Sequence, residues 1–138
     1  MSRLQLAINV SNLDESIAFY TKMFDTEPAK VRPGYANFAI ANPPLKLVLF
    51  EGQGVGGTIN HLGVETETAA EVVAAEARLA DVGLRPTAVD DTVCCFAEKT
   101  ETWVDGPDGA KWEWYVKHAD TDHPDSAVLA VDRNVCCG

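Results

Sequence analysis

The cysteines of this chain stand as two adjacent pairs, Cys94–Cys95 and Cys136–Cys137. Four cysteines scattered over a chain of this length give only about 0.1 adjacent pairs by chance. A disulfide between neighbours closes almost no loop and adds little stability, so neither pair is interpreted as a structural crosslink. Two neighbouring thiols instead offer two soft donors to one thiophilic centre. The alternative is that they are small buried apolar side chains or, for the terminal pair, part of a disordered tail.

Three further side chains are able to bind a metal ion, and each lies on a predicted strand opposite apolar neighbours. They are Gln5 in RLQLAIN, His61 in INHLGVE and Glu113 in KWEWYVK. One nitrogen donor and two oxygen donors suit a divalent ion such as Fe(II), Mn(II) or Ni(II), and three ligands leave coordination positions free. Each residue alone is more often a solvated or hydrogen-bonded polar group, and the usual iron triad has two histidines. Their matching places in a repeated pattern favour a joint site on an open, concave face.

The elements that carry these residues follow one pattern, which occurs twice along the chain. The first copy predicts a strand over residues 3–9, a helix capped by Asn12 and Glu15, and strands at YANFAI and LKLVLFE. The glycine-rich stretch GQGVGG is expected to be a flexible link.

The second copy predicts a strand at INHLGVE and a helix from Thr68 to Gly83 with Val72, Leu79 and Val82 on its inner side. Further strands are then predicted at LRPTAV, TVCCFAE, TETWV and KWEWYVK.

The spacing between the copies indicates a duplication. Gln5 and His61 lie 56 positions apart, as do the two helix caps, whereas Lys46 and Lys111 in the closing strands lie 65 apart. The nine extra residues fall in the part of the second copy that contains Cys94. The sequence therefore predicts an α+β fold of two tandem βαβββ modules, 1–52 and 58–117, in one domain. We expect their mixed sheet to form a cup with the helices on its outer face, followed by a polar tail over 118–138.

Two other charged residues have less definite roles. Glu51 at the end of LKLVLFE is a fourth ligand candidate, but aligning the closing strands through their lysines places Val48 opposite Glu113. Lys99 is interpreted as a solvated loop lysine, with neutralisation of an anionic substrate as the alternative.

Composition excludes several partners. The formal net charge is -10 and the pI about 4.6, which disfavours binding to the phosphate backbone of nucleic acids. No apolar run approaches the length that a bilayer requires, and the N-terminus has no apolar segment typical of a secretion signal. We therefore expect a cytoplasmic protein without a membrane or nucleic-acid partner.

The sequence resembles the vicinal oxygen chelate superfamily, which includes glyoxalases, extradiol dioxygenases and bleomycin-resistance proteins. Within it, four stretches resemble the organoarsenical carbon–arsenic lyases, which are also known as cadmium-induced proteins; these are RPGYANFAIANPPLKLVLFEG, NHLGVE, DDTVCCFA and WVDGPDGAKWEWYV. The similarity covers nearly all of residues 1–117.

The resemblance implies a non-haem dioxygenase that uses Fe(II) and O2 to break the C–As bond of trivalent methyl- or aryl-arsenicals, releasing inorganic arsenite. Gln5, His61 and Glu113 match the iron ligands of these lyases. Cys94 and Cys95 match their substrate-binding pair, on a lengthened loop that is a natural lid. Cys136 and Cys137 resemble their cysteine-rich tails, with possible capture of substrate as their role.

Two other functions compete with this interpretation. A glyoxalase-type isomerase using Ni(II) or Zn(II) would take Glu51 as a fourth ligand, and it leaves the cysteine pairs unexplained. A non-catalytic protein that sequesters arsenic or cadmium through thiols leaves Gln5, His61 and Glu113 unexplained. A drug-binding resistance protein without a metal is a weaker third alternative.

Overall fold

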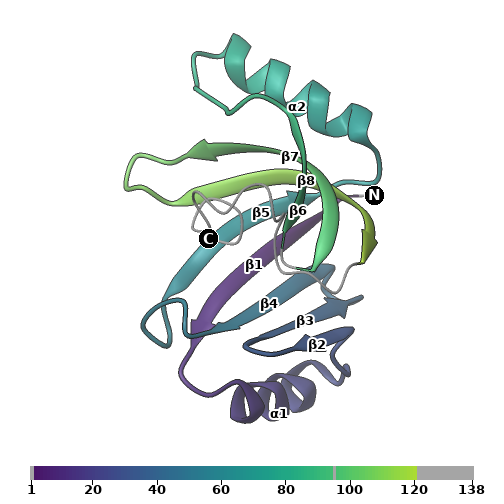
Figure 1. The fold of residues 1–138 in the computed structure, drawn as a ribbon, viewed down its shortest axis with the longest axis vertical. Coiled ribbons are helices and arrows are strands. Elements are labelled where there is room, and N and C mark those ends of the chain that lie inside the picture. Colours follow the sequence, from purple (N-terminus) through teal and green to yellow (C-terminus); the bar gives the residue numbers. More distant parts are fainter. Residues whose placement is uncertain (1, 95, 121–138) are drawn as a thin grey trace. The chain divides into compact units, whose positions relative to one another are not determined.

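The repeated pattern appears directly in the order of elements in the computed structural model, which describes residues 2–94 and 96–120. Strand, helix and three strands (β1, α1, β2, β3, β4) are followed by the same order again (β5, α2, β6, β7, β8) (Figure 1). The chain divides into two compact units, Arg3–Leu62 and a second that runs on from Gly63, so the boundary falls within β5. The predicted α+β class with two βαβββ modules is confirmed.

The first unit is a sheet covered by one helix. Its strands are ordered β2-β3-β4-β1-β5, with β1 parallel to β4, and α1 packs on β3 and β4 (Figure 1). The buried core of this unit includes Phe38, Leu47 and Leu49. The elements are β1 (Arg3–Val10), α1 (Leu13–Phe24), β2 (Lys30–Arg32), β3 (Tyr35–Ile40), β4 (Leu45–Glu51) and β5 (Ile59–Glu65).

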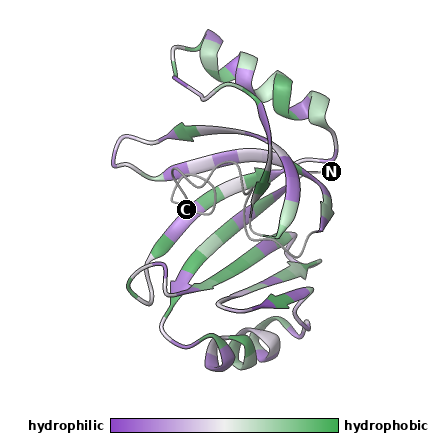
Figure 2. Cartoon of the chain, in the orientation of Figure 1, coloured by the Kyte–Doolittle hydropathy of each residue, from purple (hydrophilic) through white to green (hydrophobic). Residues whose placement is uncertain are grey.

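The second unit continues from β5 in the order β5-β8-β7-β6, and α2 packs on β7 and β8. Figure 2 shows hydrophobic and hydrophilic residues interleaved along the strands and both helices, as expected for elements that bury one face. The remaining elements are α2 (Ala69–Asp81), β6 (Asp90–Cys94), β7 (Ala97–Asp105) and β8 (Lys111–Asp120). Neither of the helices in the described ranges has the length and apolar composition needed to cross a bilayer.

Three details of the second module were predicted wrongly. Residues 84–89 (LRPTAV) form no strand. TVCCFAE is not one strand either, because β6 ends at Cys94 and β7 begins at Ala97. Val82 is exposed rather than on the inner side of α2, because the helix already ends at Asp81.

The helix caps form as predicted. The Asn12 side chain accepts a hydrogen bond from the backbone N–H of Glu15 at 2.9 Å, and Thr68 accepts one from Glu71 at 3.2 Å. Gly83 follows α2 with φ 87, the left-handed conformation that favours glycine after a helix. These caps fix where each helix leaves the strand before it.

The glycine-rich link between the modules packs tightly against β1. A Cβ atom on Gly54 would lie 2.8 Å from Asn9 Nδ2. A Cβ atom on Gly56 would lie 2.1 Å from Ser11 Oγ and 2.9 Å from the Ser11 backbone nitrogen. The stretch expected to be a flexible link therefore lies close to the end of β1 at Gly54 and Gly56, where a larger side chain would clash.

We predict that Gly56→Ala lowers the free energy of unfolding by about 1–3 kcal/mol, because the added methyl group must displace the backbone of Ser11. Urea unfolding measures this change. Gly106→Ala is the matched control, since its Cβ atom would meet only ordinary contacts at 3.5 Å and beyond. Equal stability of the two variants would show that the link does not pack as described.

Candidate metal centre

Gln5 and His61 meet as side chains from neighbouring strands. Nε2 of Gln5 lies 3.0 Å from Nε2 of His61, and both side chains are buried, with exposed fractions of 5% and 3%. The open face predicted here is polar as expected, but both side chains are buried rather than exposed. Nδ1 of His61 lies 2.8 Å from Asn60 Oδ1, within hydrogen-bond distance.

This arrangement fits a metal ion. Around an octahedral ion with bonds of roughly 2.1 Å, neighbouring ligand atoms lie about 3.0 Å apart. The Gln5 amide and His61 Nε2 already have that separation, and turning the amide presents its oxygen in place of its nitrogen. Among the described residues, no three His, Cys, Asp or Glu side chains lie together in a way that could hold a metal ion. The predicted triad would not form such a group, since one of its members is Gln5.

Glu113 occupies a buried, charged site in the second unit. Its exposed fraction is 1%, and its Oε2 accepts a hydrogen bond from Lys99 Nζ at 3.2 Å. The same ammonium lies 3.6 Å from Glu101 Oε2 and 5.1 Å from the centre of the Tyr115 ring. Lys99 is thus buried in β7 rather than solvated in a loop, and that interpretation was wrong. A shared ion bound by Gln5, His61 and Glu113 stays a prediction.

Glu101 is a functional candidate that the sequence analysis missed. Burial raises its pKa to about 8, while Lys99 acts in the opposite direction and the neighbouring Glu113 adds to the increase. Its Oε2 also accepts a hydrogen bond from Trp103 Nε1 at 2.9 Å. Near neutral pH this carboxyl group is therefore protonated, and Lys99 faces the Glu113 carboxylate as its counter-charge.

The charged group belongs to the second module alone. In β7 and β8, Trp103 pairs with Glu113 and Glu101 with Tyr115. The lysine alignment matches these pairs to Asn37–Val48 and Tyr35–Phe50 in β3 and β4, which also pair in the structure. Val48 therefore stands where Glu113 would be, and the first module has no carboxylate at that position.

Glu51 does not serve as a fourth ligand beside Gln5. Its Oε2 accepts a hydrogen bond from the backbone N–H of Leu13 at 2.8 Å, which caps the start of α1. In the parallel pairing of β1 and β4, Gln5 lies opposite Lys46 and Val10 lies opposite Glu51. At about 3.3 Å per residue, Glu51 is roughly 16 Å along the strands from Gln5.

Cys94 lies at the far end of the β6–β7 hairpin from Glu113. Cys94 pairs with Ala97, whereas Glu113 pairs with Trp103, six residues further along β7. This corresponds to roughly 20 Å along the strand. Phe96 in the turn has φ 63, a left-handed conformation that is uncommon for a bulky residue. Cys95, Cys136 and Cys137 lie outside the described residues.

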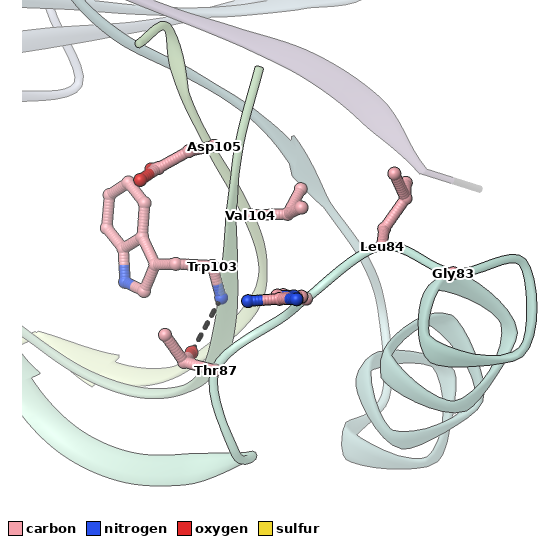
Figure 3. Close-up of a pocket in the computed structure, with 7 residues that line it drawn as sticks. Gly83, Leu84, Thr87, Trp103, Val104 and Asp105 are labelled. Atoms are coloured by element: carbon pink, nitrogen blue, oxygen red, sulfur yellow. Dashed lines mark hydrogen bonds between the residues drawn. The ribbon is translucent and has the colours of Figure 1, made fainter. Parts of the chain in front are cut away.

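A separate pocket lies at the edge of β7, with a volume of about 440 Å³. Figure 3 shows Gly83 and Leu84 beyond the end of α2, and the hydrogen bond between Thr87 and Trp103. Trp103 lines this pocket and also reaches Glu101. Because Trp103 is six residues along β7 from Ala97, this pocket is distant from the backbone of Cys94.

The chain belongs to the Glyoxalase/Bleomycin resistance protein/Dioxygenase superfamily, whose model matches residues 3–114. It is 52% identical to a "Trivalent organoarsenical cleaving enzyme" of Thermomonospora curvata over 99% of this chain and 89% of that protein. It is 54% identical to the "Cadmium-induced protein CadI" of Mycobacterium bovis over 88% of this chain and 80% of that protein. The family expectation is confirmed.

Solved structures support the same fold. The Mn(II)-bound glyoxalase from Novosphingobium aromaticivorans superposes with a TM-score of 0.61 at 18% identity, covering 96% of this chain and 46% of that chain. Methylmalonyl-CoA epimerase from Mycobacterium tuberculosis gives a TM-score of 0.60 at 16% identity, covering 92% of this chain and 90% of that one. At these identities the likeness concerns the fold alone.

We predict that Lys99→Met destabilises the metal-free protein by about 3–5 kcal/mol, because it leaves the buried Glu113 carboxylate without its counter-charge. Urea unfolding in the presence of a chelator measures this change. Lys117→Met is the control, since Lys117 forms an exposed pair with Asp120 that is worth at most about 1 kcal/mol. A loss no larger than that of the control would contradict a charged pair at Glu113.

We also predict that Glu101→Gln reduces the pH dependence of stability. The pKa of Glu101 rises from 4.5 to about 8 on folding. The folded protein then binds more protons than the unfolded chain between these values, so stability falls as pH rises through this window. Glutamine keeps an oxygen for Trp103 Nε1 and does not titrate. The free energy of unfolding of both metal-free proteins is measured from pH 5 to 8. An equal change with pH in the unmodified protein and in Glu101→Gln would refute the shift in pKa.

Proposed function

We propose that this protein cleaves the C–As bond of trivalent organoarsenicals. The observation that carries the proposal is the buried contact between Gln5 and His61, whose 3.0 Å separation fits two ligands of one metal ion. The adjacent cysteines Cys94 and Cys95 in the sequence support a thiophilic substrate. The name of the Thermomonospora curvata relative, "Trivalent organoarsenical cleaving enzyme", supports this substrate class.

In this proposal Gln5, His61 and Glu113 hold Fe(II), which when bound would supply the redox chemistry that lets O2 react with the substrate. Burial of Gln5 and His61 keeps bulk water from the donor atoms. Lys99 donates a hydrogen bond to Oε2 of Glu113 and offsets part of its charge, and the Glu113 carboxylate is the proposed oxygen ligand.

Cys94 and Cys95 hold the substrate by its arsenic. Each As–OH group exchanges with a cysteine thiol: the As–OH and S–H bonds break, an As–S bond forms and water leaves, while the organic group stays on arsenic. The overall reaction of methylarsenite balances without an added reductant: CH3As(OH)2 and O2 give CH2O and As(OH)3. The carbon is oxidised, O2 is reduced, and arsenic stays trivalent when its bond to carbon is replaced by one to oxygen.

The β6–β7 hairpin has to move in this scheme. Its end at Cys94 is roughly 20 Å along β7 from the strand pair of Glu113, so the hairpin must bend to bring arsenic to the metal site. The register shift between Glu98 and Lys99 is a natural place for that bend. Holding both reactants together then acts through proximity.

We predict that Cys94→Ser lowers kcat/KM for methylarsenite at least about 100-fold while Fe(II) binding is unchanged, because the clamp and the metal site are separate. His61→Ala is expected to abolish both Fe(II) binding and turnover. Arsenite released by Fe(II)-loaded protein in air is measured by chromatography with elemental detection, with an anaerobic reaction as the control.

Each competing function gives a different result in this experiment. Methylarsenite bound one per chain and left intact would indicate sequestration. Turnover of a methylglyoxal–glutathione adduct without O2 would indicate an isomerase, a function disfavoured by the role of Glu51 as a helix cap. Full activity of Cys94→Ser would contradict the thiol clamp.

A further inference from the structure

A run of hydrogen bonds leads away from the buried face of His61 along the first unit. His61 Nδ1 lies 2.8 Å from Asn60 Oδ1, and Asn60 Nδ2 donates to Asn9 Oδ1 at 3.0 Å. Asn9 Nδ2 then donates to Thr58 Oγ1 at 2.9 Å. The Thr58 hydroxyl donates to the backbone carbonyl of Val55 at 2.6 Å. Four consecutive contacts therefore join the imidazole to one backbone carbonyl.

The donors and acceptors of these hydrogen bonds can be assigned in only one order. A carbonyl oxygen can only accept, so the proton of the Thr58 hydroxyl points to Val55 and the Thr58 oxygen accepts from the Asn9 amide nitrogen. The Asn9 oxygen must then face the Asn60 amide nitrogen, and the Asn60 oxygen must face the imidazole. An oxygen acceptor at this place requires a proton on His61 Nδ1. The neutral ring then has its lone pair on Nε2.

We propose that Asn60, Asn9 and Thr58 form a directional relay that fixes the Nδ1–H tautomer of His61 and so keeps Nε2 available to a divalent metal ion. The last step rests on the proposed metal site. None of the three residues is placed on the metal, so they are positioning residues that act through His61.

The fold holds the relay in place through the backbone. Asn9 N–H donates to the Thr58 carbonyl at 2.8 Å, and Gly57 N–H donates to the Asn9 carbonyl at 2.9 Å. Asn9 itself is buried, and the absence of a side chain on Gly54 leaves room for its amide. The close-fitting glycine link thus sets the far end of the relay, and β1 and β5 set the near end.

The test reads the tautomer directly in metal-free protein. The full chain is labelled with 15N-histidine, treated with a chelator and studied at pH 8 by long-range 1H–15N spectra, which separate a protonated ring nitrogen from one with a lone pair. The His61 signals are assigned by their absence in His61→Gln. The variants are Asn60→Leu, which removes the acceptor, and Thr58→Val, which removes only a hydroxyl at an exposed residue. Mn(II) affinity is measured on the same proteins.

We expect the Nδ1–H tautomer in the unmodified chain, a mixture of tautomers in both variants, and recovery in Thr58→Ser. Mn(II) affinity should fall about 10–100-fold in Asn60→Leu and less in Thr58→Val. Thr26→Val is the matched control, because Thr26 also donates its hydroxyl to a backbone carbonyl, that of Phe24 at 2.8 Å, and lies outside the relay. It should change neither readout.

Three results would overturn the relay: an Nε2–H tautomer in the unmodified chain, unchanged spectra in both variants, or an equal effect of Thr26→Val. A changed tautomer with unchanged Mn(II) affinity would overturn its link to the metal. Failure of the unmodified chain to bind Mn(II) at all would instead contradict the proposed function. The spectra of metal-free protein would still test the relay, because they do not depend on metal binding.

Discussion

The contact between Gln5 and His61 is the interaction on which the proposed metal site depends. Two neutral polar side chains are buried side by side on β1 and β5, with 3.0 Å between their nitrogen atoms. Burying such groups is costly unless each finds a partner. Here the partners are each other and Asn60, so the imidazole has a defined orientation before any ion is bound. A preorganised ligand loses less free energy when it binds a metal than a mobile one does.

The two modules have the same elements but differ in their buried chemistry. The second buries Glu101 and Glu113 beside Lys99, and the first has Tyr35 and Val48 at the positions of these two carboxylates. A buried carboxylate is costly without a cation, and Lys99 supplies one in the metal-free protein. A duplicated fold thus provides the same framework twice, and charged substitutions in one copy provide the reactive groups.

The sequence was sufficient to predict elements whose signals are local. Alternation in RLQLAIN and the caps at Asn12 and Thr68 predict β1 and the starts of both helices, as observed. LRPTAV is apolar enough for a strand, but Pro86 has no N–H to donate to a sheet. The break after Cys94 occurs at Phe96, which adopts a left-handed conformation without the glycine or asparagine that usually indicates such a turn.

For the site, the sequence identified the residue types and not their surroundings. Gln5, His61 and Glu113 were candidates because their positions match in the repeat. Lys99 falls between the predicted strands TVCCFAE and TETWV and was placed in a loop, and Glu101 was not considered. In the structure both residues alternate with Trp103 on one face of β7. The hydrogen bonds around Asn60 join residues up to 51 positions apart, and no spacing rule predicts them.

The most direct test of the central claim, that Gln5, His61 and Glu113 hold one ion, is a crystal structure of Mn(II)-loaded protein with anomalous difference density. We expect a single peak within bonding distance of the Gln5 side-chain oxygen, His61 Nε2 and a Glu113 carboxylate oxygen. A peak bound by other residues, or full occupancy in His61→Ala, would contradict it.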